Sequence, residues 1–468
     1  MTRRSGNGPV PCFVLVAVFA LVFAPTQKAA AAQDAASNPG AVASAPRAAT
    51  ETAREPESDD QQPTNQQEGT VRKRERARFR LRDASWQYGR KIRVDFKTRM
   101  RGEFRTSDAT ISKDALDTLD IARRRIGVEG EVMKAVAFKV DHELAAPHDP
   151  WRDVYADITQ LREAQFRYGQ FKMPFSIDEN TSSLDMDFAY RSVSSNLLAP
   201  SRARGWMVHG DSFGRAVGYE YGVFQSDGSN ALVRTSEKRV NAGQTTAWRV
   251  TSEPLHGLDP WIANLHVGFA QTHGDMPEGV SGIKGRTVLG EEFYKPEFFV
   301  FGRRDRKGFE FQWLGGPASV KMEQMTLTEE RKGESVEDTD LPPYQVKGWY
   351  VSGSYAITGE SKVRGLDKPE RPLFQGGFGA LEVAVRVEQI TFGSGQTGGV
   401  VGSKSPRADI VPTNTDRIVS VSGNWYPNRW VKIQLTIFNE KFADPSMLQS
   451  PLLKPNLLSR VFRIQFSI

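Results

Sequence analysis

From about Lys91 to the C-terminus, apolar and polar residues alternate with a period of two. Segments 381–388 (LEVAVRVE) and 431–437 (VKIQLTI) are clear examples, because Leu, Val or Ile takes every second position. In a β-strand, successive side chains point to opposite faces, so this pattern predicts strands with one apolar and one polar face. About 16 such segments can be marked, separated by clusters of Gly, Pro, Asn and Asp that favour turns.

Consecutive hairpins with no βαβ period predict an all-β protein. We expect an antiparallel up-and-down transmembrane β-barrel of about 16 strands over residues 91–468, joined by alternately short and long connections. Turn residues gather at 226–230, 314–317 and 426–428, and the long polar inserts 328–343 and 393–415 are expected as loops on one rim.

The alternation alone does not place the apolar face in lipid, because soluble β-sandwiches alternate too. Aromatic residues near strand ends favour a membrane, where such rings settle at the headgroup level. Charges of both signs in the middle of strands favour a water-filled lumen. The clustered aromatics are Trp206, Tyr219, Tyr221, Phe298, Phe299, Phe301, Trp349, Tyr350, Trp425, Tyr426 and Trp430.

The N-terminus has the pattern of a secretory signal peptide over residues 1–32. Arg3 and Arg4 precede an apolar stretch at 10–23, and small residues follow at 29–32. Residues 33–90 are expected to form a disordered, basic periplasmic segment. Its stretch 71–82 (VRKRERARFRLR) is either solvated or a short amphipathic helix.

Cleavage of the signal peptide changes both the thiol content and the charge. It removes Cys12, the single cysteine, which excludes disulfides, metal–thiolate sites and thiol nucleophiles in the mature chain. It also removes three basic residues and no acid, so the formal charge falls from +6 to +3. That field is too weak to indicate nucleic-acid binding. At 39% hydrophobic and 25% charged residues, with one long apolar run, the chain is not a polytopic helical membrane protein.

Signals for enzyme chemistry are weak, and we expect no metal and no cofactor. The chain has no HExxH motif and no Walker A loop. One G-x-S-x-G match occurs at 210–214, but a nucleophile elbow needs a following helix, and strand-like YEYGVF follows instead. We therefore interpret Ser212 as part of a hairpin turn.

Alternation also assigns the basic residues of the lumen. If Ile92, Val94 and Phe96 face lipid, the bases between them face the pore, because Lys or Arg on the lipid face costs about 2–4 kcal/mol at mid-depth. Guanidinium groups bind phosphate oxygens in bidentate fashion. Arg124, of opposite parity, is expected to point outward or to lie at a rim. The anion-pathway candidates are Arg93, Lys97, Arg99, Arg101, Arg123, Arg125, Lys139 and Arg167.

Several motifs extend this interpretation. GQFKMPFSIDENTSSLDMDFAYRS at 169–192, LLAPSRARGWMVHG at 197–210 and YEYGVFQSDG at 219–228 resemble the phosphate-selective porin family, porins O and P. The resemblance implies a 16-stranded, trimeric outer-membrane channel with arginine ladders and a lysine cluster at its constriction. The chain departs from this pattern at its end, where Phe466-Ser467-Ile468 replaces a terminal aromatic residue.

Segment 173–204 is long and follows a strand, so we expect it to fold inward as a constriction loop. The basic residues available to narrow the pore there are Lys172, Arg191, Arg202 and Arg204.

The sequence therefore predicts a passive porin in the outer membrane of a Gram-negative bacterium. It would form a homotrimer, contact outer-membrane lipid and lipopolysaccharide, and conduct inorganic phosphate, polyphosphate or other small anions. One alternative is a weakly selective or organic-solute porin on the same fold. Another is an outer-membrane enzyme or adhesin, which would need Ser212 beside a histidine such as His209.

Overall fold

The computed structural model describes one compact unit of the chain, within Lys73–Ile468. The described residues are 77–80, 84–108, 119–146, 150–230, 243–256, 258, 261–262, 264–295, 298–362, 366, 369–394, 411–448 and 453–468. The signal peptide expected at 1–32 and most of the segment expected at 33–90 lie outside them. Within the described ranges, no α-helix is both long enough and apolar enough to cross a bilayer.

Sixteen antiparallel strands of the described chain form a closed β-barrel, which confirms the predicted fold. They are β3 (Ile92–Ser107), β4 (Leu119–Val132), β5 (Val136–Glu143), β6 (Trp151–Ile158), β7 (Gln165–Lys172), β8 (Arg202–Ser212), β9 (Val217–Phe224), β10 (Thr245–Ser252), β11 (Leu265–Ser281), β14 (Phe299–Gly315), β15 (Ala318–Arg331), β16 (Leu341–Ala356), β17 (Ala380–Gly393), β18 (Asn414–Tyr426), β19 (Val431–Phe442) and β20 (Asn456–Ser467).

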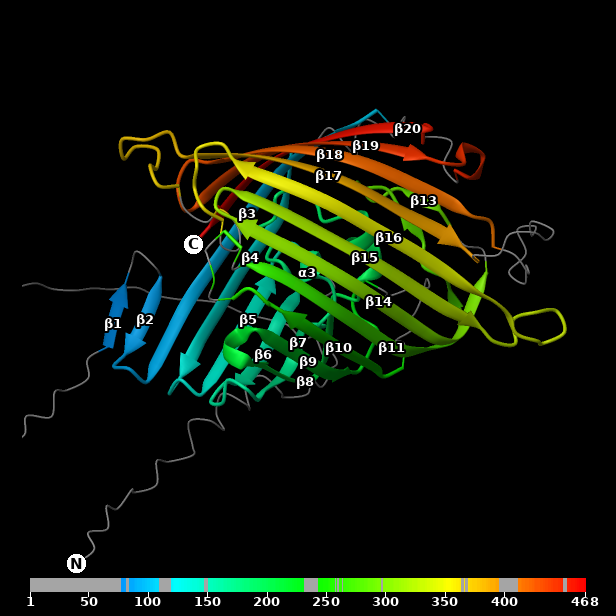
Figure 1. Cartoon of the computed structure of the whole chain (residues 1–468), viewed down its shortest axis with the longest axis horizontal. Helices are drawn as coiled ribbons and strands as arrows, with labels where there is room; N and C mark the ends of the chain where they lie inside the picture. The colour runs from blue at the N-terminus through cyan, green and yellow to red at the C-terminus, as the bar shows by residue number, and fades with distance from the viewer. Residues whose placement is uncertain are drawn as a thin grey trace, which may run out of the picture. The chain divides into compact units, whose positions relative to one another are not determined.

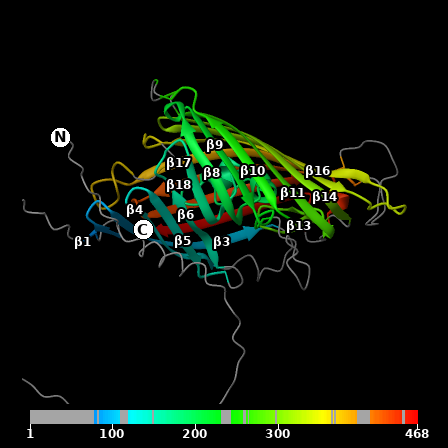
Figure 2. The same ribbon diagram turned by 90° about the horizontal axis from the view of Figure 1, so that it is seen from below.

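Each barrel strand pairs with its neighbours in the chain, and the ring closes between β20 and β3 (Figure 1). In the closing pair, Ser459–Ser467 lie opposite Arg99–Ser107. Strands β8 to β11 run side by side in the same way (Figure 2). Closure leaves no barrel strand with an unpaired edge, which a spanning sheet requires because hydrocarbon offers no hydrogen-bond partners.

Among the described residues, two short strands lie ahead of the barrel strands, before residue 91. Strand β1 (Ala77–Arg80) pairs with β2 (Ser85–Tyr88), and β2 pairs with the first residues of β3, Ile92–Asp95. Residues 77–80 of the basic stretch 71–82 therefore form a strand and not a helix. Their partner is the neighbouring strand β2, which in turn pairs with the start of β3.

The two faces of the barrel wall differ as the alternation predicts. On β17, Val383 and Val385 are 44% and 50% exposed on the outside, whereas Glu382 and Arg386 are 1% and 3% exposed on the inside. The aromatics divide by the same parity. Trp349 and Trp425 point outward, but their neighbours Tyr350 and Tyr426 are buried inside and donate hydrogen bonds to Glu323 and Glu382.

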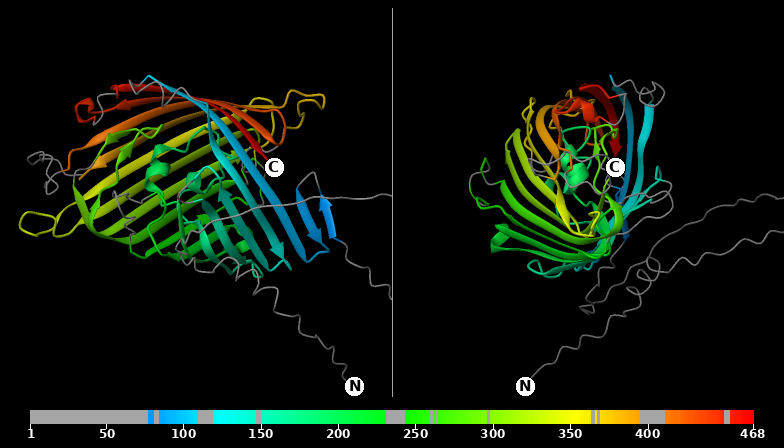
Figure 3. Two further views of the ribbon diagram at one scale, coloured as in Figure 1. Left: turned by 180° about the vertical axis from the view of Figure 1, so that it is seen from behind. Right: turned by 90° about the vertical axis from the view of Figure 1, so that its right-hand side faces the viewer.

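Part of the lumen is filled by an apolar core. Residues 173–201, called here the constriction segment, fold into the barrel with helices α3 (Ile177–Asn180) and α4 (Val193–Leu198) (Figure 3). The hairpin of β12 (Gly285–Arg286) and β13 (Glu292–Tyr294) joins them. Phe175, Leu198, Phe293 and Phe392 meet in this core, all fully buried. The alternation gave no sign of such a core.

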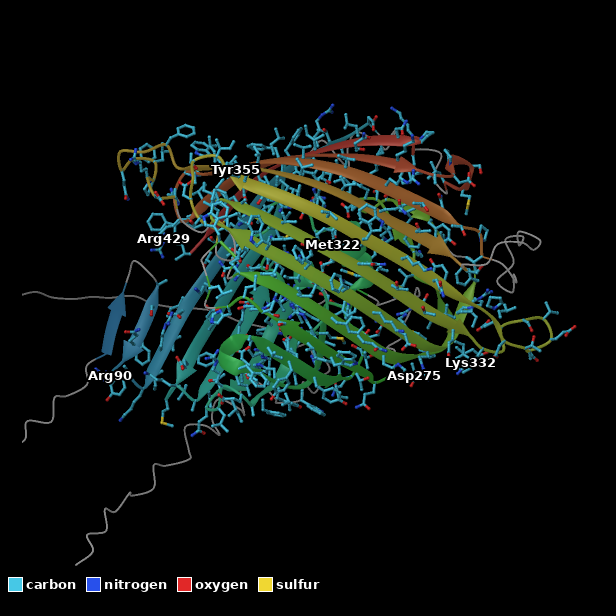
Figure 4. The ribbon with its side chains drawn as sticks, in the orientation of Figure 1. Arg90, Asp275, Met322, Lys332, Tyr355 and Arg429 are labelled. Carbon is cyan, nitrogen blue, oxygen red and sulfur yellow. The ribbon has the colours of Figure 1, made fainter. Side chains whose placement is uncertain are left out.

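The two ends of the barrel differ in their connections. The turn end carries the short links β4–β5, β8–β9, β14–β15 and β18–β19 and the C-terminus, together with one long link, 357–379, between β16 and β17. The loop end carries the constriction segment and the links β11–β14 and β15–β16. In Figure 4, Asp275 and Lys332 mark the loop end, and Arg90, Tyr355 and Arg429 mark the turn end. In the described parts of the links lie the one-turn 3-10 helices η2 (Phe213–Arg215) and η3 (Pro445–Met447).

Candidate functional site

Buried carboxylates of the barrel wall hold the constriction segment on one side of the lumen. Glu323 of β15 accepts hydrogen bonds from the backbone N–H groups of Ile177 and Asp178, at 2.7 and 3.1 Å, where α3 begins. Glu388 of β17 accepts from the backbone N–H of Val193 at 2.6 Å, where α4 begins. Both helices therefore present unpaired N–H groups to a carboxylate, which satisfies donors that the short helices leave free.

A second attachment surrounds Asp187. Its carboxylate lies 3.0 Å from the Nζ of Lys321 and 2.9 Å from the Nζ of Lys362, and all three side chains are almost completely buried. Burial alone would raise the pKa of Asp187, but the two lysines hold it well below its usual value. Lys432 donates to the backbone carbonyl of Met186 at 2.6 Å. The segment is thus tied to β15, β19 and the link 357–379.

The opposite side of the lumen is a basic wall made by β3 to β8. Its centre is a group of four inward arginines, called here the arginine square: Arg99 and Arg101 on β3, and Arg123 and Arg125 on β4. The strand register places Arg99 directly opposite Arg125, and Arg101 directly opposite Arg123. Side chains directly opposite in an antiparallel pair are about 5 Å apart at Cβ, so four positive charges share a small area.

Carboxylates neutralise only part of the arginine square. Glu103 pairs with Arg101 at 2.8 Å, and Glu143 pairs with Arg123 and Arg125 at 3.4 and 3.2 Å. Asp141, which also pairs with Lys139, lies 3.9 Å from Arg125. Glu103 is also shared with Arg105 and Arg463, which lie 3.2 and 2.6 Å away.

Arg99 has no ion-pair partner in the described part of the chain, which covers both strands beside it. The square therefore keeps an excess of positive charge.

The arginine square lies at the constriction. The Arg123 guanidinium donates a hydrogen bond of 2.6 Å to Ser183 Oγ of the constriction segment, which reaches across from the far wall. Tyr190 of the segment likewise donates a hydrogen bond of 2.6 Å to Glu103, so the segment contacts the wall beside the four arginines. Arg124, between two members of the square, is exposed and has the outward parity expected for it.

The remaining wall candidates point inward, but each has an acidic partner. Lys97 pairs with Glu129 at 3.3 Å, and Arg167 pairs with Asp157 at 2.7 Å. Arg93 pairs with Asp95 at 2.7 Å, and Lys139 pairs with Asp141 and Asp153, both at 3.6 Å. These bases line the lumen as close ion pairs, so they contribute less net field than the square does.

Three of the four constriction candidates lie inside the barrel. Lys172 donates to the backbone carbonyl of Glu179, Arg191 pairs with the Glu179 carboxylate at 3.2 Å, and Arg202 pairs with Asp153 at 2.8 Å. Burial alone would raise the pKa of Glu179, but Arg191 and Lys172 lower it. These bases therefore hold the segment in place.

Arg204 departs from the expectation. It belongs to β8, is exposed, and lies on the outer face opposite Gln170, to which it donates a hydrogen bond of 3.5 Å. The constriction segment ends before β8 begins at Arg202, so strand alternation resumes and turns Arg204 away from the pore. It cannot narrow the pore.

The lysines around Asp187 were missed from sequence, although the family resemblance implied a cluster. Lys321 alternates with outward Val320 and Met322, so parity could have found it. Lys362 lies in the link 357–379, where no periodicity marks the inward side. Ser212, by contrast, is the last residue of β8, directly before the hairpin link to β9.

With this geometry in place, comparison with known proteins decides the family. The family model described as phosphate-selective porin O and P matches residues 92–468. The chain belongs to this family. It is accordingly a porin, a channel of the outer membrane of Gram-negative bacteria. No curated protein matches the sequence of this porin.

Solved structures similar to this porin share its fold at low identity. The anion-selective porin from Comamonas acidovorans is 11% identical, with a TM-score of 0.51, over 81% of this chain and 100% of that chain. The outer membrane channel DcaP of Acinetobacter baumannii is 9% identical, with a TM-score of 0.51, over 81% and 98%. OmpF of Salmonella typhi, in a complex with daunomycin, is 12% identical, with a TM-score of 0.50, over 82% and 99%.

Proposed function

We propose that this porin is a passive, anion-preferring channel that admits phosphate or polyphosphate to the periplasm. The observation that carries the proposal is the arginine square, where two pairs of arginines face each other at the constriction with too few carboxylates to neutralise them. Like charges directly opposite each other destabilise a sheet. An anion between them removes that repulsion, so the square favours anions over cations.

The chemistry of the square suits phosphate. A guanidinium presents two parallel N–H donors that match two oxygens of one phosphate group, and charge-assisted bonds of this kind are about twice as strong as neutral ones. A divalent phosphate also gains more from four guanidinium groups than a monovalent chloride does.

Conduction additionally requires the anion to leave, and the lumen favours this. On other parts of the inner wall, the bases are paired with carboxylates, as Lys97 is with Glu129 and Arg167 is with Asp157. Such pairs offer weaker sites than an unpaired guanidinium, so an anion meets several moderate sites. Several moderate sites permit passage, whereas one deep site would trap the ion.

Competition between anions tests the preference for phosphate. In planar bilayers, phosphate should inhibit chloride current, and Arg99→Gln should weaken that inhibition by about tenfold, the effect of losing one charge-assisted contact. Arg124→Gln is the matched control, since it removes the same charge from the outer face of β4. If phosphate at the same concentration leaves chloride current unchanged, a weakly selective or organic-solute porin is the better description.

We also propose that the porin is a homotrimer. Strands β5, β6, β7, β9 and β10 have eight residues each, fewer than the 9–11 residues that span a bilayer. Outward rings cluster there, with Trp206 6.4 Å from Phe166 and 6.1 Å from Tyr221 between centroids. Contact with neighbouring copies of the porin would cover the outer face of these short strands, together with outward Arg204.

The molar mass of the protein part in detergent, measured by light scattering, tests the assembly. The wild-type porin should have three times the mass of one chain, and Trp206→Ala combined with Tyr221→Ala should release monomers. A monomeric wild-type porin would contradict the trimer, but it would leave the anion proposal standing.

A further inference from the structure

The outer face formed by the long strands β16 to β20 carries its charges toward one end of the barrel. Toward the turn end its outward side chains are apolar or aromatic, including Tyr355, Trp425 and Phe466. Toward the loop end the outward side chains include four bases, called here the basic collar: Lys347, Arg417, Lys441 and Arg460, all exposed. Among the described residues of these five strands, no outward side chain is acidic.

Arg417 and Lys441 form the most unusual part of the collar. The register places Arg417 of β18 directly opposite Lys441 of β19, on the outer face. Gln389 of β17 lies on the other side of Arg417 and accepts a hydrogen bond of 3.2 Å from it. Within the described chain, neither base has a carboxylate in ion-pair distance.

This arrangement is unfavourable without a counter-ion. Two like charges directly opposite across strands destabilise the sheet, and an apolar band lies beside them, where Val419 and Ile437 are 46% and 38% exposed to the outside. Bases on a lipid-facing surface cost least at the interface, where they can meet anionic headgroups. We therefore expect an anionic group of the membrane to bind beside Arg417 and Lys441.

The collar faces a specific leaflet. In outer-membrane barrels the longer loops are extracellular and the short turns periplasmic, so the loop end lies at the outer leaflet. Lys347 lies in the same belt, two strands from Arg417 across β17. Thr391 and Thr415, whose hydroxyls are 2.9 Å apart, lie between the two bases and add hydroxyl groups to the surface.

We propose that the basic collar binds the phosphate groups of lipid A, the phosphorylated glycolipid of the outer leaflet, with Arg417 and Lys441 clamping one phosphate between them. Lys347 lies within reach of a second phosphate. The bound phosphate converts a repulsive cross-strand pair into a bridged one. This site is separate from the pore, because its residues have the opposite strand parity to the lumen residues.

Native mass spectrometry of the full-length mature porin in detergent tests the site, with bis-phosphorylated lipid A as the probe. The wild-type porin should bind lipid A at least about tenfold more tightly than the double variant Arg417→Gln/Lys441→Gln, since two charge-assisted contacts are lost. The control Arg90→Gln/Lys134→Gln removes two charges from exposed turns at the other end, and should bind lipid A as the wild type does.

A second variant keeps the test valid if the double variant folds poorly. Arg417→Glu creates an opposite-charge pair with Lys441, so the barrel should fold at least as well as the wild type while losing lipid A. The collar lies outside the lumen, so these variants should keep the wild-type reversal potential, which separates this proposal from the anion proposal.

Three results would overturn the proposal. One is equal binding of lipid A to the wild-type porin and to the variants Arg417→Gln/Lys441→Gln or Arg417→Glu. Another is equal binding of lipid A and its dephosphorylated form by the wild type. The third is equal affinity for phosphatidylglycerol, which would assign the collar to phospholipid headgroups in place of the glycolipid.

Discussion

Asp187→Asn should release the middle of the constriction segment from the barrel wall. In the folded porin, the Asp187 carboxylate lies 3.0 Å from Lys321 and 2.9 Å from Lys362, with exposed side-chain fractions of 6%, 10% and 1% for the three residues. Lys362 keeps a second partner in Glu382. Lys321 keeps none among the described residues, so the substitution leaves one buried ammonium group without a counter-charge.

The free-energy cost of Asp187→Asn follows from the loss of one partner of a buried ion pair. Removing one partner of a buried ion pair costs about 3–5 kcal/mol, and the asparagine can still accept one hydrogen bond, which favours the lower end. At about 3 kcal/mol, the ratio of attached to displaced segment falls by about a hundredfold. The attachments through Glu323 and Glu388 remain, so only the part of the segment around Asp187 should move.

Single-channel recording in planar bilayers measures the effect. We expect Asp187→Asn to show larger conductance and stronger open-channel current fluctuations than the wild type, because the segment no longer stays against the wall. The double variant Asp187→Asn/Lys321→Met is the control. It removes the unpaired ammonium and fills the site with apolar atoms, and should recover much of the wild-type behaviour. Wild-type conductance and noise in Asp187→Asn would refute the assigned role of this ion pair.

Two further predictions concern stability. In both, the free energy of unfolding in urea is measured on protein inserted in lipid vesicles. Val385→Arg, on the outer face of β17, should lower it by about 2–4 kcal/mol, and an unchanged value would show that Val385 does not face hydrocarbon. Tyr190 donates a 2.6 Å hydrogen bond to Glu103, and burial together with Glu103 raises its pKa to about 12. Since this pKa is raised above the value of about 10 of an unfolded chain, the stabilisation is fully present below pH 10 and is lost as the pH rises through about 12. Tyr190→Phe should therefore differ from the wild type by about 1.5–3 kcal/mol at neutral pH, with the difference shrinking over that window. If the difference in unfolding free energy between Tyr190→Phe and the wild type does not change with pH, the role assigned to the hydrogen bond between Tyr190 and Glu103 is contradicted.

Along uninterrupted strands, the face of the barrel wall that each residue occupies could be predicted from the sequence. Arg99, Arg101, Arg123 and Arg125 were assigned to the lumen because their strands keep a strict period of two, and one side of each is apolar. The structure places all four inside. The same reasoning, applied to neighbouring positions, would have separated outward Trp349 from buried Tyr350, since adjacent residues of a strand cannot share a face.

The chain departs from these predictions where the period breaks. Arg204 was expected in the constriction loop, but the segment ends at Ser201, whose φ of 64° is left-handed, and β8 begins at Arg202. The link 357–379 has no periodicity, which hid Lys362. The inner core of Phe175 and Phe293 depends on packing between segments distant in the chain, which no local pattern encodes.

The zero-current potential across a KCl gradient tests the central claim most directly, that the arginine square makes the lumen favour anions. The wild-type porin should give a potential with the sign of the chloride equilibrium potential. Replacing Arg99, Arg101, Arg123 and Arg125 together by Gln should move it toward the potassium value. A wild-type potential on the potassium side, or one that the fourfold substitution leaves unchanged, would contradict the account.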